Sequence, residues 1–162
     1  MPAKDTAASS TPLSGADLWS SSLASHVPFL IARARALMVR RCNQALRPLG
    51  LNVRTFSLLW LTTEPVPATQ RELSDFLDLD PSQVVALIDD LEAQGLVERR
   101  ANPADRRARQ TVATEKGRRL CGTAQAAVDR ATEEVFAGLT KGEQAQLTSL
   151  LLGINRQKPS RA

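Results

Sequence analysis

The chain has 162 residues, of which 43% are hydrophobic and 4% aromatic, and its formal net charge is +4. This length suits one domain with its own core, and the abundance of leucine and alanine favours a mainly α-helical fold. Two distant cysteines and a single histidine exclude a disulfide framework and a cysteine- or histidine-rich metal site, and no apolar run is long enough to span a membrane.

The first part of the chain predicts a tail followed by two helices. Residues 1–13 are small and polar and are predicted to be disordered, whereas 14–157 are predicted to form a single domain. Ser14 and Asp17 suit the cap of a short helix. Its apolar side would consist of Leu18, Trp19, Leu23 and Val27. Pro28 then suits the start of a longer helix that ends near Arg47. One apolar stripe follows this helix: Leu30, Ala34, Leu37, Met38, Cys42, Ala45 and Leu49.

Three further helices are predicted between residues 52 and 95. Asn52 caps the first, which carries Phe56, Leu59 and Trp60. Thr69 and Glu72 form a T-x-x-E capping box for the second, which carries Leu73, Phe76 and Leu77 on one face. Asp80, Pro81 and Gln83 are an N-cap, a first-turn proline and a third-position partner for the last helix. Its buried stripe would be Val84, Leu87, Ile88 and Leu91, and Gly95 would end it in a left-handed conformation. Two short helices joined by so few residues indicate a helix-turn-helix.

The next segment predicts two strands and then two more helices. Residues 96–101 and 110–113 can pair across turn-forming residues 102–105, which include Asn102 and Pro103. Thr114 would cap a long helix to about Ala137, and a Thr140–Glu143 capping box would start the last helix. The last helix carries Leu147, Leu150, Leu151 and Ile154. A helix-turn-helix followed by a two-stranded ribbon is a winged helix, flanked here by N- and C-terminal helices.

Basic residues are concentrated around this ribbon. Between Val97 and Arg119 there are eight basic and three acidic residues, a net charge of +5, so the remainder of the chain carries −1. This uneven distribution is typical of a surface that binds nucleic acid, although a solvated basic surface would give the same count.

These residues resemble the MarR family of transcriptional regulators, whose wing follows the pattern D-x-R-x3-V-x-L-T-x-x-G. The pattern is met at Asp105, Arg107, Thr114 and Gly117. Thr111 and Ala113 stand where the family has valine and leucine, which would weaken the packing of the second strand. The resemblance covers about residues 27–155. It implies a winged helix lobe at about 52–113, dimerisation helices at about 28–47 and 114–155, and a homodimer.

The resemblance also implies which residues bind double-stranded DNA. The buried stripe of the last helix leaves Ser82, Gln83, Ala86 and Asp90 facing out, and the first three would face the major groove, where base edges are read. Asp89 and Glu92 would repel phosphates, so the C-terminal half of this helix should point away from DNA. Arg107 matches the family's minor-groove arginine, Asp105 would orient it or close the wing turn, and Arg106 and Arg109 would bind phosphates. Two alternatives stay open: Gln83 completes the capping box with Asp80, and Asp105 and Arg107 form an ordinary surface pair. Asp78 stands where the family commonly has glycine, and an aspartate tolerates the left-handed conformation of that turn.

Effector binding is a further expectation from the resemblance, since family ligands bind where the dimerisation helices meet the winged lobe. That region would be lined by Trp19, Phe29, Arg33, Phe56 and Trp60. An arginine beside aromatic rings suits an aromatic carboxylate or a phenolic anion, but packing in the core explains the aromatic residues equally well. Cys42 lies on a buried stripe, whereas Cys121 has Arg118 and Arg119 nearby, which would lower its pKa if it were exposed.

Taken as a whole, the sequence predicts a homodimeric repressor that binds a pseudo-palindromic operator and is relieved by a small ligand. It would lie in the cytoplasm, because no signal peptide is visible, and would need no cofactor. Three alternatives remain: a winged-helix protein-interaction module, a redox-responsive regulator that uses Cys42 or Cys121, and an enzyme. The last is disfavoured because no nucleophile–base pair, metal set or glycine-rich phosphate loop occurs.

Overall fold

The computed structural model describes residues 15–101 and 109–156, so the tail predicted for residues 1–13 lies outside the described part. The chain divides into two compact units, residues 1–37 and 38–162, and each is described by itself. The first unit holds helix α1 (Gly15–Leu18), the 3₁₀ turn η1 (Ser22–Ser25) and the first half of helix α2 (Val27–Leu46).

Apolar side chains of the first unit lie largely in solvent. The four residues predicted to form one apolar side, Leu18, Trp19, Leu23 and Val27, are each more than half exposed. The Arg33 guanidinium lies 4.8 Å from the centre of the Trp19 ring, a cation–π contact that covers one ring face. A helix of four residues has no independent stability, so this unit offers apolar surface without a core to bury it.

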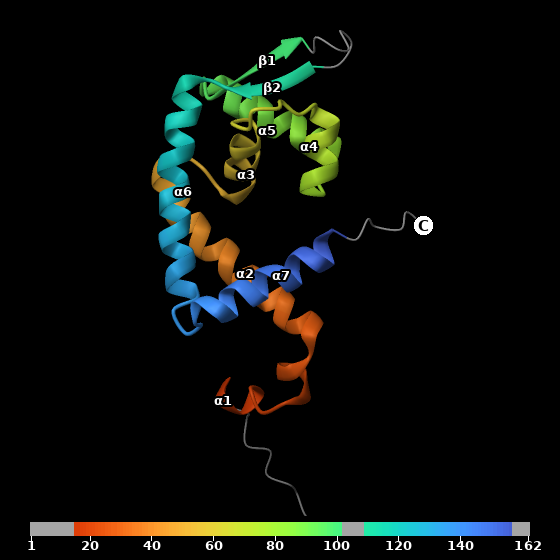
Figure 1. The fold of residues 1–162 in the computed structure, drawn as a ribbon, viewed down its shortest axis with the longest axis vertical. Coiled ribbons are helices and arrows are strands. Elements are labelled where there is room, and N and C mark those ends of the chain that lie inside the picture. The colour runs from red at the N-terminus through yellow and green to blue at the C-terminus, as the bar shows by residue number, and fades with distance from the viewer. Residues whose placement is uncertain (1–14, 102–108, 157–162) are drawn as a thin grey trace, which may run out of the picture. The chain divides into compact units, whose positions relative to one another are not determined.

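The second unit contains the rest of the fold (Figure 1). After the second half of α2 come the 3₁₀ turn η2 (Arg47–Leu49) and helices α3 (Val53–Leu61), α4 (Gln70–Leu77) and α5 (Pro81–Ala93). Strands β1 (Val97–Ala101) and β2 (Arg109–Ala113) follow, and then helices α6 (Glu115–Val135) and α7 (Lys141–Asn155). The predicted fold class, mainly α-helical with a two-stranded wing, is confirmed.

Helix starts are determined by local capping. Asn52 with Thr55, Thr69 with Glu72, Asp80 with Gln83 and Thr140 with Glu143 each form a reciprocal capping box. Thr114 caps α6 by accepting a hydrogen bond from the Gly117 amide at 3.1 Å. Each cap satisfies amide groups that have no partner within the helix, which is why the sequence places these starts correctly.

The core lies where α3, α4, α5 and the start of α6 meet, and α5 contacts α3, α4 and β1. Its fully buried side chains include Leu46, Leu58, Leu59, Leu73, Val84, Ile88, Leu91 and Leu96. The predicted stripe of α5 is therefore confirmed, with Leu87 packed against the core from its edge. This packing leaves the opposite side of α5 in solvent.

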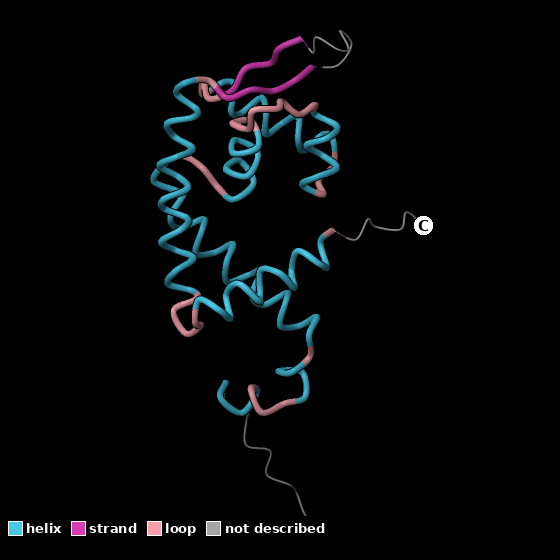
Figure 2. The backbone as a smooth tube through the Cα atoms, viewed as in Figure 1, coloured by secondary structure: helices cyan, strands magenta, loops and turns pink. Residues whose placement is uncertain are grey.

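The two strands pair antiparallel, with Val97 opposite Ala113 and Ala101 opposite Arg109, and form the hairpin drawn in magenta in Figure 2. A segment after α3 borders the other edge of β2. The amide of Thr111 donates to the Ala68 carbonyl at 3.4 Å, and the amide of Ala113 donates to the Thr62 carbonyl at 3.0 Å. The strand is therefore held on both edges, although its side chains are smaller than those usual in the pattern.

Helix α6 begins in close contact with the turn that follows α5. The hydroxyl of Thr114 donates to the Gly95 carbonyl at 2.8 Å, and the Lys116 ammonium donates to the Gln94 carbonyl at 2.7 Å. A Cβ atom at Gly117 would lie 2.0 Å from the Leu96 carbonyl oxygen, so only glycine fits there. We call these contacts the α5–α6 clamp.

One predicted buried face is wrong, and the condition attached to Cys121 is not met. Phe76 was expected beside Leu73 and Leu77 on the buried face of α4, but it is 76% exposed. Ser74 completes that face instead, because its hydroxyl donates to the Leu79 carbonyl at 2.7 Å. Cys121 is buried rather than exposed, and burial raises the pKa of its thiol, an effect that a hydrogen bond with Thr63 only partly offsets.

Candidate DNA-binding surface

The N-terminal half of α5 presents a small, uncharged surface to solvent. Ser82, Gln83 and Ala86 are all exposed, as predicted, while the residues between them anchor the helix. Val85 is also 40% exposed. Val85 was not predicted to face out because it adjoins Val84, which belongs to the buried stripe. At 100° per residue, however, Val85 lies only about 60° from Ser82 around the helix axis, which places it on the exposed side. We call Ser82, Val85, Ala86 and Asp89 the groove face of α5.

The cap of α5 orders the first residues of this face. An Asp80 carboxylate oxygen accepts from the Ser82 amide at 2.8 Å, and the amide of Asp80 donates to the Gln83 side-chain oxygen at 3.4 Å. The hydrogen bonds from Ser82 lower the pKa of the Asp80 carboxyl, so it remains ionised and keeps the first turn formed. Gln83 therefore does complete the capping box, which leaves its amide nitrogen for another partner.

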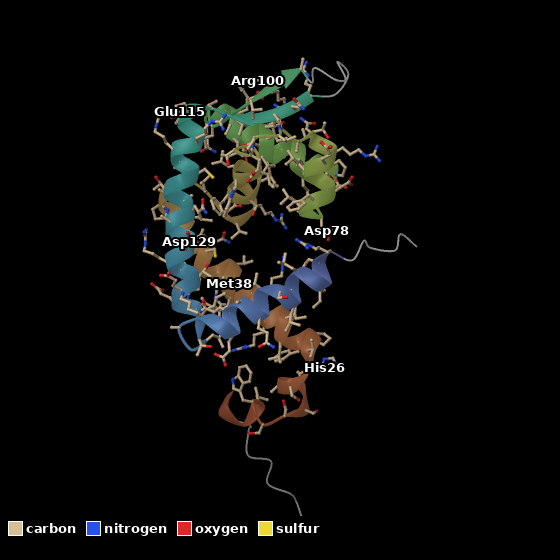
Figure 3. The ribbon with its side chains drawn as sticks, in the orientation of Figure 1. His26, Met38, Asp78, Arg100, Glu115 and Asp129 are labelled. Carbon is tan, nitrogen blue, oxygen red and sulfur yellow. The ribbon has the colours of Figure 1, made fainter. Side chains whose placement is uncertain are left out.

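The turn between α4 and α5 fixes how the two helices cross. Asp78 adopts a left-handed conformation, with φ 52° and ψ 47°, and is the only non-glycine residue with positive φ in the described ranges. The amide of Leu79 returns to the Ser74 carbonyl at 3.2 Å. An aspartate in place of glycine thus keeps the turn, and Asp78 marks the C-terminal end of α4 in Figure 3.

The wing hairpin holds only part of the predicted contact set. Arg109 is exposed on β2, opposite Ala101, and has no ion-pair partner among the described residues. Asp105, Arg106 and Arg107 lie outside the described residues. The Gln110 side chain, near the open end of β2, donates to the Pro67 carbonyl at 3.3 Å.

Three arginines of the basic segment 97–119 pair with carboxylates, one of them Arg119 with Glu115 on α6 at 3.2 Å. The Arg99 guanidinium on β1 pairs with Asp89 and Glu92 on α5, and the Arg100 guanidinium pairs with Glu98. Figure 3 shows Arg100 on the hairpin. Burial alone would lower the pKa of Arg99, but the hydrogen bond that its guanidinium donates to Asp89 and the charges of Glu92 and Asp89 raise it above its ordinary value. The free positive charge of the wing is therefore smaller than a count of residues indicates.

The residues predicted to bind an effector fall in both units. Trp19 and Arg33 stack on each other in the first unit, where Phe29 is half-buried. In the second unit the rings of Phe56 and Trp60 lie 5.4 Å apart, with Phe56 in the core. A hollow of about 240 Å³ opens beside Trp60. Its lining is Ser57, Trp60, Leu61, Glu64, Phe76 and Leu77.

The second thiol and the groups that could hold a metal ion are placed as follows. Cys42 is buried, and burial raises the pKa of its thiol against the effect of a hydrogen bond with Thr132. Within 15–101 and 109–156, no group of three or more histidine, cysteine, aspartate or glutamate residues is arranged to hold a metal ion. No helix in these ranges is long and apolar enough to cross a membrane.

Comparison with known proteins gives a consistent result. Residues 49–108 match the sequence model of the MarR family. A MarR-family transcriptional regulator from Rhodococcus sp. RHA1 has 37% identity and a TM-score of 0.80, over 84% of this chain and 96% of that one. CouR from Rhodococcus jostii RHA1, solved with p-coumaroyl-CoA, has 38% identity and a TM-score of 0.78, over 85% and 96%. The transcriptional repressor CouR bound to a 23-mer DNA duplex has 27% identity and a TM-score of 0.77, over 84% and 96%.

Proposed function

The chain belongs to the MarR family of transcriptional regulators, and from this we propose that it is a homodimeric repressor that releases its operator when a small ligand binds. The observation that carries the proposal is the groove face of α5. Its first turns are exposed, uncharged and ordered by a cap, and the basic wing hairpin follows directly in the chain.

The distribution of buried residues suggests different roles for the winged lobe and for helix α7. The winged lobe, about residues 52–113, contains most of the buried core, whereas α7 contains no buried residue at all. Leu150, Leu151, Leu152 and Ile154 are all exposed on α7. A helix with this much exposed apolar surface needs a partner, and a second copy with two-fold symmetry supplies one. Helices at about 28–47 and 114–155 would form that interface.

The proposed DNA contacts combine base and shape readout. Ser82, Gln83 and Ala86 would contact base edges in the major groove. Arg107 would enter the minor groove with Asp105 orienting it, while Arg106 and Arg109 would bind phosphates. Support comes from the exposure of the α5 residues and of Arg109, and from the similar repressor solved on a DNA duplex.

The proposed effector is an aromatic anion. The hollow beside Trp60 and Phe76 is large enough for one aromatic ring, and both side chains are exposed to it. The similar protein CouR was solved with p-coumaroyl-CoA, whose acyl group is a phenol. Glu64, which lines the hollow, would repel a carboxylate, so the anionic group of the ligand would point away from Glu64.

A gel shift on the DNA upstream of the protein's own gene, at two salt concentrations, tests the proposal. We expect one fragment to be bound in preference to scrambled DNA, and binding to weaken at the higher salt as phosphate contacts are lost. A protein-interaction module would bind neither DNA. Adding 4-coumarate or salicylate should then release the fragment, whereas benzylamine, which carries the opposite charge, should not.

A further inference from the structure

Arg99 is counted among the basic residues expected from the sequence to bind nucleic acid, but its side chain packs against α5 instead. Its side chain is only 16% exposed, and its two terminal nitrogens are taken by Asp89 and Glu92. The backbone amide of Arg99 also donates to a Glu92 carboxylate oxygen at 3.3 Å. One residue of β1 is thus bound at three points to two carboxylates of α5, and little of its guanidinium is available for a phosphate.

Asp89 lies where DNA is expected to approach. Ser82, Ala86 and Asp89 are spaced i, i+4 and i+7, so they form one line along the groove face, opposite the buried Val84 and Ile88. The Asp89 side chain is 59% exposed. An unpaired carboxylate one turn beyond Ala86 would lie next to the DNA backbone and repel it. The sequence therefore places an acidic group on a surface that must approach a polyanion.

We propose that Arg99 is a charge-masking residue: its single positive charge offsets one of the two negative charges of Asp89 and Glu92, which reduces the repulsion as α5 enters the major groove, and it makes no DNA contact itself. The inference rests on the proposed function, because it assigns a role within the same DNA-binding surface. It also separates the arginines of the wing into two kinds, with Arg99 acting through α5 and Arg109 free to contact phosphate.

The contrast with other ion pairs supports this role. Arg71 and Asp75 on α4 are 4.0 Å apart with an arginine side chain 86% exposed, an arrangement that contributes little. Arg99 instead contacts two acids at once from a mostly buried position, where screening by solvent and salt is weaker. Removal of Arg99 would leave the carboxylates of Asp89 and Glu92 without this partner on the groove side of α5, whereas removal of Arg71 breaks only one long, exposed pair.

Four variants measured with wild type on the operator fragment test the masking. Arg99→Ala should weaken binding about tenfold at low salt, because Asp89 and Glu92 become uncompensated. The triple variant Arg99→Ala/Asp89→Asn/Glu92→Gln removes those charges and should bind within about threefold of wild type, with an unchanged salt slope. Asp89→Asn/Glu92→Gln alone should bind no more weakly than wild type. Arg71→Ala is the matched control and should change affinity less than about twofold.

The salt slope of the triple variant separates masking from direct contact. If Arg99 bound a phosphate, the triple variant would stay weak and its slope would fall by about 0.9; that result overturns the proposal. Thermal melting of each variant, with affinities corrected for the folded fraction, detects a merely structural role. A loss that vanishes after this correction, or an unchanged affinity of Arg99→Ala, also overturns it.

Failure of the proposed function would look different. In that case wild type would prefer no fragment over scrambled DNA. The same variants, measured on any DNA duplex at low salt, would still test whether Arg99 masks the carboxylates, because repulsion between carboxylates and phosphates does not depend on the DNA sequence. Rescue of the Arg99→Ala deficit by the triple variant there supports the inference, and lack of rescue refutes it.

Discussion

Two backbone positions show how much depends on single residues. Asp78 holds the left-handed turn between α4 and α5, and an aspartate can do so because its short side chain tolerates positive φ. Gly117 is constrained by space rather than by conformation. A Cβ there would lie 2.9 Å from the Leu96 carbonyl carbon and 3.3 Å from Leu59 Cδ1, besides its clash with the carbonyl oxygen. The family pattern gave this glycine, but its reason is visible only in three dimensions.

We expect Gly117→Ala to destabilise the fold by about 3 kcal/mol, because the added methyl must push α6 away from the backbone of Leu96. Gly122→Ala, on the same helix, is the matched control, since a Cβ there meets nothing within 4 Å. It should stabilise the fold by about 0.5–1 kcal/mol through helix propensity. Urea denaturation of both variants measures the difference. Equal stabilities would show that the close approach at Gly117 is relieved without cost.

Gln83 has two roles that one variant can separate. Gln83→Ala removes the capping contact with Asp80 and, if Gln83 reads adenine, also costs about 1–3 kcal/mol of binding to the cognate site. Thermal melting reports the cap, and the ratio of cognate to scrambled binding reports the base contact. A lower melting temperature with an unchanged ratio would leave capping as its only role.

Val85 offers a further contact, on the groove face of α5. An exposed valine on a recognition helix suits contact with a thymine methyl group. We expect Val85→Ala to weaken binding to the operator, and thymine-to-uracil replacement at the contacted base to weaken wild type by a similar factor. The two changes together should cost no more than either alone. Fully additive losses would argue that valine and methyl group do not touch.

Helix starts were predictable and buried faces were less so, and the two differ in physical origin. A cap depends on residues within one turn, so Thr69, Asp80 and Thr140 could be identified from sequence alone. Which side of a short helix is buried depends on what packs against it, and there Phe76 was misplaced. The ion pairs of Arg99 join residues seven and ten positions apart on two elements, and no local pattern predicts them.

Capping also predicts a pH dependence. Hydrogen bonds from the Thr69 and Thr140 backbones lower the pKa of Glu72 and Glu143, and bonds from Ser82 lower that of Asp80. A lowered pKa in the folded state means that the ionised carboxylate stabilises the fold. This contribution is complete above the ordinary values of 4.5 for glutamate and 3.8 for aspartate, and it is lost as pH falls through the lower folded values.

The variant Glu72→Gln/Glu143→Gln should therefore lose less stability than wild type between about pH 6 and about pH 3, since its caps no longer titrate. Urea denaturation at several pH values measures this. At about pH 6 the variant should be the less stable of the two, because an amide is a weaker acceptor than a carboxylate. Parallel curves for the two proteins would mean that the capping carboxylates contribute nothing to acid sensitivity.

The proposed dimer sets what the whole molecule can recognise. A two-fold axis would place two copies of α5 in successive major grooves, about 10 base pairs apart, so the operator should be pseudo-palindromic. Burial of the exposed apolar surface of α7 would stabilise the dimer, and family membership makes a homodimer the expected state. Affinity for one half-site alone should be far lower than for both, because the second contact is then intramolecular.

Leu150→Asp or Leu151→Asp should break the dimer and lose operator affinity together, because a charge cannot be buried unpaired in an apolar interface. Ser149→Asp puts the same charge at an exposed polar position of α7 and serves as control. Light scattering gives the mass, and gel shifts give the affinity. A monomeric Leu150→Asp protein that kept full operator affinity would contradict the proposed architecture.

Spacing of the half-sites gives an independent test on unmodified protein. Inserting about five base pairs rotates one half-site by about half a turn, and inserting about ten restores its face. Binding should fall to near the non-specific level with the first insertion and recover in part with the second. Equal binding to both inserted sites would indicate that the two copies of α5 are not rigidly linked.

The α5–α6 clamp gives α6 the properties of a lever arm. Hydrogen bonds from Thr114 and Lys116 and the close approach at Gly117 connect the start of this 21-residue helix to the turn that ends α5, so a tilt of α6 would be transmitted to the end of α5. At about 1.5 Å per residue, α6 is about 30 Å long, and a tilt of about 5° at its far end carries the clamped end by nearly 3 Å. Mirrored in a second copy, that displacement doubles and exceeds what hydrogen bonds to base edges tolerate. A ligand that displaces the far end of α6 by a small amount would thus cause a larger displacement of α5, large enough to release the DNA.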